Sequence, residues 1–494
     1  MRPPLYALIQ EGVKHMTNVL LVSSEVVPFA KTGGLADVVG TLPHALDKSK
    51  IDARIIMPKW GCIPQEYKDK MVLIKSIYVQ LGWRSQYCGI LELEEGGITT
   101  YFIDNEYYFG ADHLYGYIHE DMEKFAFFCK AALAILPEVD FQPDIIHCND
   151  WQAAAIPFLL KAQFMGDEYY QDIKTIVTIH NLRYQGVWDK KALNDVFGLP
   201  ASYFAADKLE YQGDVNVLKG GLVYADYITT VSPTYAEEIQ TIYGGEGLDG
   251  LLRAKSGQLC GILNGISYDE YNPSKDELIY QTYNRRDFAS GKRANKRRLQ
   301  EDLGLAQNED AMLIGVVSRL VGQKGFDLIS QIIGELSHWN IQLVVLGTGE
   351  DRYENMFRWY NDHYGDKFSA NIKFDNTLAH RIYAACDAFL MPSQFEPCGL
   401  SQIISMKYGT LPIVRETGGL KDTVEPYNEF TGEGTGFSFA PYMSGDLLSV
   451  MRYACEVFAD KTAWNGIIRR AMACDFSWEA SAKEYAALYE GMNG

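Results

Sequence analysis

The chain has 494 residues, of which 47% are hydrophobic and 13% aromatic, and its formal net charge is −19. This length is too great for a single hydrophobic core and predicts two large domains. The composition excludes an intrinsically disordered chain, and the negative charge argues against nucleic acid and anionic membrane surfaces as partners.

The N-terminus and the cysteines indicate where the protein works. No apolar run is long enough to span a membrane, so we expect a soluble protein. Residues 1–15 lack the apolar core of a secretory signal and the acid-poor bias of a transit peptide, and we expect a disordered extension or a misassigned start there. The nine cysteines are scattered without CxxC pairs, which favours a reducing cytoplasm over disulfides or a zinc site.

A strand, a glycine loop and a helix open the chain. The apolar run 18–24 is followed by the loop Lys31-Thr-Gly-Gly-Leu-Ala-Asp37 and then by a helical pattern. This order predicts a doubly wound α/β sheet, although the loop lacks the GxGxxG dinucleotide fingerprint. Gly33 and Gly34 allow a ligand to approach the backbone closely beside the Lys31 ammonium. From spacing alone, Lys31 is equally well an exposed loop lysine.

Two more predicted strands end in polar residues. The runs 144–151 (DIIHCNDW) and 175–181 (TIVTIHN) are typical of buried parallel strands. Because ligands bind at the carboxyl ends of strands in open α/β sheets, we expect Asp150 and His180 to face one cleft. Taken alone, a histidine at a strand end is more often structural than functional.

The βα pattern resumes after turn signals at 273–276 (PSKD), which predict a linker between domains. A strand over 314–320 is followed by a short loop and a helix. Arg319 and Lys324 flank this loop, where a guanidinium and an ammonium group suit a diphosphate. Surface salt bridging is the alternative interpretation.

Two helices are predicted outside these loops. The basic run from Arg285 to Arg298 lies on a helix that opens the second domain, and we expect its charges to form a solvated face. The last helix, over 477–489, is amphipathic. Its predicted apolar side consists of Trp478, Ala482, Tyr485 and Leu488.

The stretch 392–424 carries the densest pattern. A strand ends in a loop that holds one carboxylate, Glu396, and Gly399 lets the backbone bend before a helix over 401–407. A loop that leads into a helix N-terminus directs free N–H groups and a positive dipole end at a ligand. The glycines of 417–419 repeat this arrangement before a second predicted helix.

These motifs resemble those of bacterial glycogen synthases and plant starch synthases. Phe-Glu-Pro-Cys-Gly-Leu, Tyr-Gly-Thr-x-Pro and Thr-Gly-Gly-Leu-x-Asp-Thr-Val stand within 392–424 in family order and spacing. Lys-Thr-Gly-Gly-Leu-x-Asp-Val, Thr-Ile-His-Asn-Leu-x-Tyr-Gln-Gly and Ser-Arg-Leu-x-x-Gln-Lys-Gly-x-Asp match elsewhere. The resemblance covers nearly the whole chain from Met16. An ordinary glycine-rich βα unit is the alternative for 392–424.

The resemblance implies an α/β protein with two Rossmann-like domains facing a cleft, the GT-B fold. We expect an N-terminal, acceptor-side domain over 16–272 and a C-terminal, donor-side domain over 273–475. A helix over 476–494 would cross back to the N-terminal domain.

The resemblance also implies the site residues. The implied catalytic set is Glu396, His180, Arg319, Lys324 and Asp150. The implied donor-binding set is Lys31, Gly33, Gly34, Asp37, Asn264, Gly347, Phe374, Cys398, Gly399, Leu400, Ser401, Thr417 and Gly418. Glu396 would hold glucose hydroxyls and stabilise the cationic ring, while Arg319 and Lys324 stabilise the leaving diphosphate. Phe374 stands where relatives often stack a tyrosine on adenine. We expect neither a cofactor nor a metal.

The chain departs from the family pattern at Asn149, Gln152, Gly110, Ser267 and Tyr271. Asn149 and Gln152 replace histidines beside Asp150, so any role that rests on those histidines is in doubt. Gly110 lies in a loop where relatives often carry proline and arginine, close to the acceptor.

The implied reaction is transfer of glucose from ADP-glucose to the non-reducing end of an α-1,4-glucan such as glycogen, with retention. Because no second carboxylate is evident for a double displacement, we favour a front-face route. Two alternatives stay open: a GT-B enzyme that uses UDP-glucose or a small acceptor, and a catalytically silent glucan-binding or regulatory protein. The expected compartment is the bacterial cytoplasm, or a plastid for a plant chain.

Overall fold

The computed structural model describes residues 16–116 and 118–493, so the extension expected over 1–15 lies outside the described residues. The chain forms two compact units. The first contains the chain up to Thr229, Gly245–Cys260 and the chain from Ala482, and the second contains Thr230–Gly244 and Gly261–Ser481. The boundary expected between residues 272 and 273 falls inside the second unit, because residues 261–272 belong to that unit.

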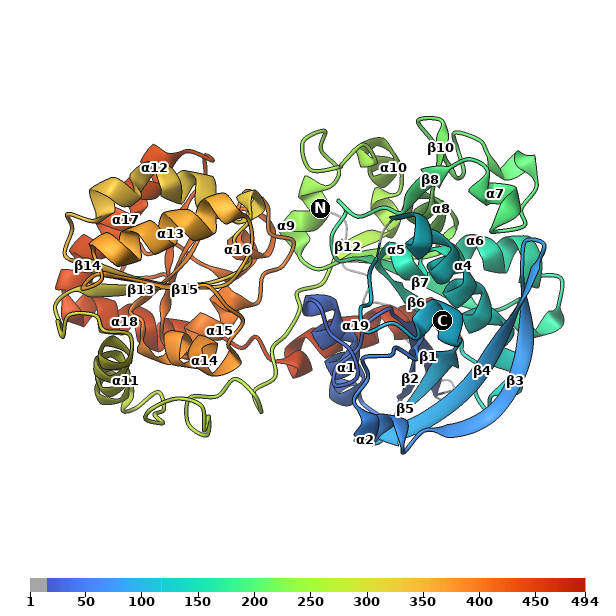
Figure 1. Ribbon diagram of the computed structural model, residues 1–494, viewed down its shortest axis with the longest axis horizontal. Helices are drawn as coiled ribbons and strands as arrows, with labels where there is room; N and C mark the ends of the chain where they lie inside the picture. The colour runs from blue at the N-terminus through green and yellow to red at the C-terminus, as the bar shows by residue number, and fades with distance from the viewer. Residues whose placement is uncertain (1–15, 117, 494) are drawn as a thin grey trace. The chain divides into compact units, whose positions relative to one another are not determined.

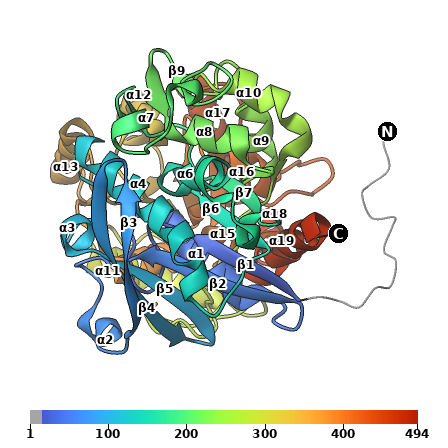
Figure 2. The same cartoon turned by 90° about the vertical axis from the view of Figure 1, so that its right-hand side faces the viewer.

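The first unit is built on a nine-stranded sheet with the order β12-β11-β7-β6-β1-β2-β5-β4-β3. Its strands are β1 (Thr17–Val22), β2 (Ile51–Pro58), β3 (Val72–Leu81), β4 (Arg84–Glu95), β5 (Ile98–Asp104), β6 (Ile145–Asn149), β7 (Lys174–Ile179), β11 (Tyr227–Thr230) and β12 (Leu259–Gly261). The pairs that join β7, β6, β1, β2 and β5 are parallel, whereas β3 and β4 add an antiparallel edge (Figure 2). A small antiparallel sheet contains β8 (Val187–Asp189), β10 (Asp214–Asn216) and β9 (Glu210–Tyr211).

The helices of the first unit connect these strands. They are α1 (Gly34–Ala45), α2 (Gln65–Lys68), α3 (Glu106–Phe109), α4 (Ile118–Ala134), α5 (Asp150–Ala153), α6 (Ala155–Leu159), α7 (Ala192–Asp195), α8 (Val217–Tyr224) and α10 (Asp249–Ala254). Shorter helical turns are η1 (Leu136–Glu138), η2 (Leu160–Phe164), η3 (Glu168–Tyr170), η4 (Ala201–Tyr203) and η5 (Ser256–Gln258). The order of strand, glycine loop and helix predicted at the start of the chain is confirmed by β1, the 31–33 loop and α1, but the helix begins at Gly34 and includes residues 34–37 of the predicted loop.

The second unit is a parallel six-stranded sheet with the order β15-β14-β13-β16-β17-β18. Its strands are β13 (Met312–Val317), β14 (Ile341–Leu346), β15 (Phe368–Asn371), β16 (Ala388–Met391), β17 (Leu411–Arg415) and β18 (Phe437–Phe439). Its helices are α9 (Pro233–Glu238), α11 (Phe288–Asp302), η6 (Gly322–Lys324), α12 (Phe326–Leu336), α13 (Asp351–His363), α14 (Asn376–Ala385), α15 (Ser401–Lys407), α16 (Gly418–Thr423), α17 (Ser444–Ala459) and α18 (Lys461–Ala471). Helices cover both faces of the sheet, with α12, α13 and α17 on one side and α11, α14, α15 and α18 on the other (Figure 1). The predicted doubly wound class is confirmed.

The periodicity of α12 shows why the sequence folds this way. Phe326, Ile329, Ile332 and Ile333 recur on one face of the helix, and all four are buried. Burying such side chains contributes roughly 1.5–3 kcal/mol each, which fixes the helix against the sheet. None of the helices in the described part of the chain is long and apolar enough to span a membrane.

The basic helix α11 differs from expectation. Lys292 and Lys296 are buried rather than solvated. The Lys292 ammonium donates to Thr410 Oγ1 at 2.7 Å and to the Ala384 and Tyr408 carbonyls, while Lys296 pairs with Asp387 at 2.7 Å. The prediction of a solvated face was wrong for these two lysines because Thr410 and Asp387, which bind their ammonium groups, lie 118 and 91 residues away in the sequence.

The last helix, α19 (Trp478–Asn493), begins in the second unit and continues in the first from Ala482. Tyr489 is fully buried, whereas Leu488, predicted on the apolar side, is only half-buried. The Tyr489 hydroxyl lies 2.7 Å from Nδ1 of His147, a buried residue of β6. Burial, and then the neighbouring His180, lower the pKa of His147 to about 3, so its ring stays neutral.

Replacing the buried hydroxyl should weaken the first unit. Tyr489→Phe leaves Nδ1 of His147 without its partner, and we expect the free energy of unfolding to fall by about 1–3 kcal/mol. Urea unfolding followed by circular dichroism measures the change. The control Tyr243→Phe alters a side chain that is 99% exposed and should change nothing. An unchanged midpoint for Tyr489→Phe would show that this contact does not stabilise the fold.

Candidate functional site

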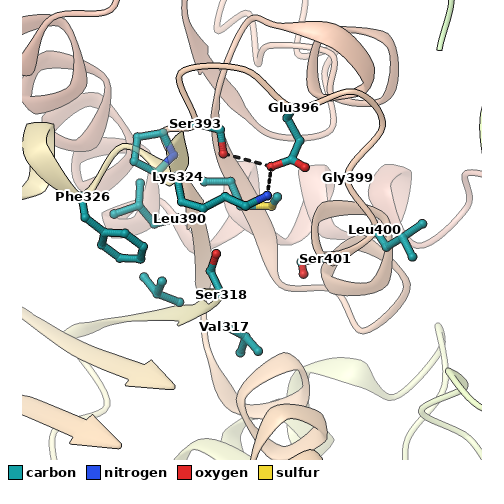
Figure 3. A pocket seen from close by; sticks show the side chains of 13 residues that line it. Val317, Ser318, Lys324, Phe326, Leu390, Ser393, Glu396, Gly399, Leu400 and Ser401 are labelled. Carbon is teal, nitrogen blue, oxygen red and sulfur yellow. Dashed lines mark hydrogen bonds and ion pairs between the residues drawn. The ribbon is translucent and has the colours of Figure 1, made fainter. Parts of the chain in front are cut away.

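A small cavity of about 90 Å³ lies where β13 and β16 end in the second unit (Figure 3). Apolar strand residues and polar loop residues line it together: Val316, Val317, Ser318, Lys324, Phe326, Leu390, Met391, Pro392, Ser393, Glu396, Gly399, Leu400 and Ser401. The carboxyl ends of parallel strands are where open α/β sheets bind ligands. The cavity therefore has the expected place for a binding site.

A buried ion pair lies at this cavity. Glu396 Oε2 lies 2.6 Å from the Lys324 ammonium and accepts a hydrogen bond from the Ser393 hydroxyl at 3.1 Å (Figure 3). The Glu396 side chain is 9% exposed and that of Lys324 is 18% exposed. The structure therefore joins two of the predicted catalytic residues, which are 72 positions apart in the sequence.

Backbone geometry positions both partners. Lys324 ends the turn η6, and the following Gly325 has φ 79°, where a Cβ would come within 2.1 Å of the Pro392 carbonyl oxygen. Gly399 has φ 71°, and a Cβ there would lie 2.5 Å from Gln402 Oε1. Only glycine adopts such backbone conformations at this packing distance without strain.

The loop leads into α15, whose first residue is Ser401. Leu400 at the N-cap makes no side-chain capping bond, so the first N–H groups of the helix are available to a ligand. The Ser401 hydroxyl accepts a bond from Tyr383 at 3.1 Å. Burial raises the pKa of the Cys398 thiol to about 12, so this residue contributes backbone rather than a reactive sulfur.

The second glycine turn already has an internal acceptor. The Gly418 N–H donates to Glu238 Oε1 at 3.1 Å, and the Thr417 hydroxyl donates to the same oxygen at 3.0 Å. Gly418 lies against the Glu396 carbonyl oxygen, and the polar groups of Thr417 and Gly418 are engaged by a carboxylate that the sequence analysis did not identify. Their predicted role in donor binding stays a prediction.

Four other predicted site residues lie in the second unit: Arg319 of the catalytic set, and Asn264, Gly347 and Phe374 of the donor-binding set. Arg319 is exposed and forms no ion pair with any other described residue. Asn264 is buried, yet its Oδ1 has no hydrogen-bond partner within the described ranges. Gly347 has φ 153°, and a Cβ there would lie 1.8 Å from the Ser318 carbonyl oxygen. Phe374 presents an aromatic ring that is 94% exposed.

In the first unit, a carboxylate occupies the Lys31 loop. Glu25 Oε2 accepts from the Thr32 N–H at 2.5 Å, the Thr32 hydroxyl at 2.9 Å and the Gly33 N–H at 3.1 Å. The Lys31 ammonium pairs with Asp37 at 2.7 Å. The loop amides at Thr32 and Gly33 are therefore engaged within the protein, while the Lys31 side chain stays half-exposed at the rim of a hollow of about 440 Å³.

Asp150 lies in a strained position at the end of β6. Its φ is 56°, which is rare for a residue with a side chain, and its Oδ1 accepts from the His180 N–H at 2.8 Å. Burial raises the pKa of Asp150 to about 7. This effect outweighs the backbone hydrogen bonds from His180 and Asn181, which lower the same pKa. Asp150 and His180 are thus in direct contact, and the expectation that both face one cleft stays a prediction.

His180 is held by one of the family departures. Its Nε2 lies 3.0 Å from Asn149 Oδ1, an acceptor, so Nε2 carries the proton and Nδ1 is an acceptor. Burial lowers the pKa of His180 to about 3, which keeps the ring neutral. Asn149, which replaces a histidine of the family pattern, therefore has a defined role in orienting His180.

The other departures lie in varied surroundings. The Ser267 hydroxyl accepts from the N–H groups of Asp269 and Glu270 at 3.3 Å, and Tyr271 stacks on His380 with ring centroids 5.1 Å apart. Gln152 is buried, and its Oε1 has no partner in the part of the chain that the structure describes. Gly110 packs on α3, where a Cβ would lie 2.6 Å from the Glu106 carbonyl oxygen.

The comparisons with known proteins agree across the chain. Residues 18–254 match the starch synthase catalytic domain, and residues 299–456 match glycosyl transferases group 1. The glycogen synthase of Lachnospira eligens is 58% identical over 97% of this chain and 100% of its own, and that of Caldicellulosiruptor saccharolyticus is 51% identical over 96% and 99%. The chain belongs to the glycogen synthase and starch synthase family.

Solved structures extend this result. The catalytic domain of starch synthase IV from Arabidopsis thaliana, bound to ADP and acarbose, is 32% identical with a TM-score of 0.88, covering 97% of this chain and 99% of that one. A sucrose-phosphate synthase from Thermosynechococcus elongatus shares the fold at 18% identity and a TM-score of 0.62, over 97% and 99% of the two chains. The protein is a GT-B glycosyltransferase of the glycogen synthase family, and the predicted family, fold and enzyme class are confirmed.

The pKa of Asp150 predicts a pH-dependent stability difference. From about pH 4 to 7 the folded state keeps a proton that the unfolded state has lost, so the carboxyl group weakens the fold progressively as the pH rises. Asp150→Asn keeps the Oδ1 acceptor and removes this cost. We expect its melting temperature to exceed that of the unmodified chain at pH 8 and the gap to close towards pH 4.

Differential scanning calorimetry across this pH range measures the gap. The control Asp172→Asn changes an exposed carboxylate and should give a small, pH-independent gap. A constant gap for Asp150→Asn would contradict the raised pKa.

Proposed function

We propose that the protein transfers glucose from ADP-glucose to the non-reducing end of an α-1,4-glucan with retention of configuration. The observation that supports this proposal is the Lys324–Glu396 pair, a cation suited to phosphate and a carboxylate suited to sugar hydroxyls that line the same cavity. The high identity to glycogen synthases along the full length supports the reaction class.

Departure of the nucleoside diphosphate builds negative charge on phosphate, and two cations are suitably placed to stabilise it. Arg319 follows β13, is exposed, and makes no ion pair with other described residues, so its guanidinium is available to bind two phosphate oxygens. Lys324 supplies a point charge from the neighbouring turn, helped by the N–H groups at Gly399 and Leu400.

Glu396 changes partners as the donor binds. When Lys324 turns to the phosphate, the carboxylate is released to accept hydrogen bonds from glucose hydroxyls and to stabilise positive charge on the sugar ring. The Asn264 amide, whose Oδ1 has no partner within the described ranges, adds a further acceptor for the sugar. The Ser393 hydroxyl keeps Glu396 oriented during this exchange.

Two observations support adenine as the base of the donor: the exposed ring of Phe374 and the ADP in a related structure. The exposed Phe374 ring offers a flat apolar surface for stacking a nucleobase, and the related starch synthase IV structure was obtained with ADP. Phenylalanine gives no hydrogen bond to discriminate among bases. The choice of ADP-glucose over UDP-glucose therefore requires a direct test.

In the first unit, we propose that Asp150 and His180 form a sugar-binding end of β6 and β7. The neutral His180 ring offers Nδ1 as an acceptor for a hydroxyl. No second carboxylate lies at the Glu396 cavity among the residues that line it, which supports the front-face route. The leaving phosphate would accept the proton of the attacking hydroxyl.

Donor competition tests the proposed reaction. Labelled ADP-glucose and UDP-glucose are supplied in parallel with glycogen, each with and without a chelator. We expect incorporation of label from ADP-glucose in both conditions. Incorporation from UDP-glucose alone would overturn the donor, and incorporation from neither would favour a silent glucan-binding protein.

Removal of the carboxylate should separate catalysis from donor binding. Glu396→Ala should lower kcat about a hundredfold or more, because stabilisation of the cationic sugar is lost. The affinity for ADP should be unchanged or tighter, since Lys324 no longer has an internal partner. Steady-state kinetics and calorimetric titration with ADP measure the two effects.

The control Glu309→Ala removes a carboxylate that is 67% exposed and should change neither quantity. Near-normal turnover by Glu396→Ala would remove Glu396 from the mechanism.

A further inference from the structure

Helix α9 contributes three hydrogen-bonding side chains to the loops around Glu396. The Ser232 hydroxyl at its N-cap donates to the Pro397 carbonyl at 2.7 Å, and Thr234 bonds to Asp422 through its N–H and its hydroxyl at 2.9 and 2.6 Å. Glu238 at its last turn accepts from Thr417 and Gly418. All of these residues belong to the second unit.

The turn that Glu238 binds supports the backbone of Glu396 itself. The Gly419 N–H donates to the carbonyl oxygens of Glu396 and Pro397 at 3.2 and 3.1 Å. Gly418 has φ 43°, and a Cβ there would lie 2.1 Å from the Glu396 carbonyl oxygen. The 417–419 turn and the Glu396 loop are therefore in direct backbone contact, so a shift of one displaces the other.

A second contact to this loop comes from the end of β17. Arg415, at the end of β17, donates to the Gln394 carbonyl at 2.5 Å and packs over the Tyr442 ring. Burial lowers the pKa of Arg415, and the Glu238 carboxylate counteracts this effect. The Glu238 carboxylate therefore favours the charged form of Arg415, in addition to accepting hydrogen bonds from Thr417 and Gly418.

We propose that Glu238 is a positioning residue for Glu396, acting through the 417–419 turn. The Glu238 carboxylate accepts a hydrogen bond from the Gly418 N–H and so orders the 417–419 turn. The turn contacts the Glu396 backbone and thereby fixes its position beside the cavity. A displacement of about 1 Å at a reacting group can cost roughly a hundredfold in rate. The proposal deepens the function proposed above and rests on Glu396 as the sugar-binding carboxylate.

Three variants test this role with ADP-glucose and glycogen as substrates. Glu238→Ala leaves the Gly418 N–H without its acceptor, and we expect kcat to fall about tenfold or more while the KM for ADP-glucose changes less than about threefold. Glu238→Gln keeps an oxygen acceptor and should retain kcat within about threefold. The control Glu237→Ala alters the exposed neighbour and should match the unmodified chain.

A second measurement does not depend on turnover. Hydrogen–deuterium exchange of peptides covering 394–402 should be faster in Glu238→Ala than in Glu238→Gln or Glu237→Ala. If Glu238→Ala does not fold, Ser232→Ala is measured in its place. This variant removes the donor to the Pro397 carbonyl, and we expect the same loss of kcat and the same faster exchange.

The outcomes separate this proposal from the function on which it rests. Absence of transfer by the unmodified chain would defeat the proposed function, and the exchange data would then decide whether Glu238 orders the loop. Unchanged kcat and exchange in Glu238→Ala, or a loss of ADP affinity equal to the loss of kcat, would overturn the positioning role.

Discussion

The ion pair between Lys324 and Glu396 is the interaction on which the site depends. Two opposite charges lie 2.6 Å apart with little access to water, and neither could stay buried alone without a large desolvation cost. The pair therefore keeps both charged groups in the site while their charges compensate each other. When a donor binds, its phosphate can replace Glu396 as the partner of Lys324, and its hydroxyl groups can replace Lys324 as the partner of Glu396. Donor binding then also frees Glu396 to act on the sugar.

This exchange requires a backbone that brings distant loops together and keeps them there. Gly325 lies against Pro392, Gly418 against Glu396, and Gly419 against Cys398, each at a separation that excludes a Cβ. Hydrogen bonds from Gln402 to the Cys398 and Gly399 carbonyls complete the frame. The second unit thus presents a preorganised site, in which the electrostatic groups are positioned before substrate arrives.

Sequence reasoning located the βα elements and the charged residues at strand ends because both follow from local patterns. The strands and the helix over 401–407 were accessible in this way, whereas the family resemblance gave Lys324 and Glu396 as site residues without predicting their contact. The roles of Glu238 and of the buried lysines of α11 were not accessible, since they depend on contacts between segments far apart in the chain. Glu25 is only seven and eight residues from the amides of Thr32 and Gly33, yet the glycine pattern of this loop did not show that the Glu25 carboxylate accepts hydrogen bonds from them. The role of Asn149 was likewise not predictable, because it depends on the contact of its side chain with the His180 ring.

The most direct measurement is a crystal structure of the unmodified chain with ADP. The account predicts that the Lys324 ammonium lies within hydrogen-bonding distance of a phosphate oxygen and that Glu396 Oε2 has separated from it, while Ser393 still donates to the carboxylate. A phosphate bound elsewhere, with the Lys324–Glu396 pair still closed, would contradict the exchange on which the proposed mechanism rests.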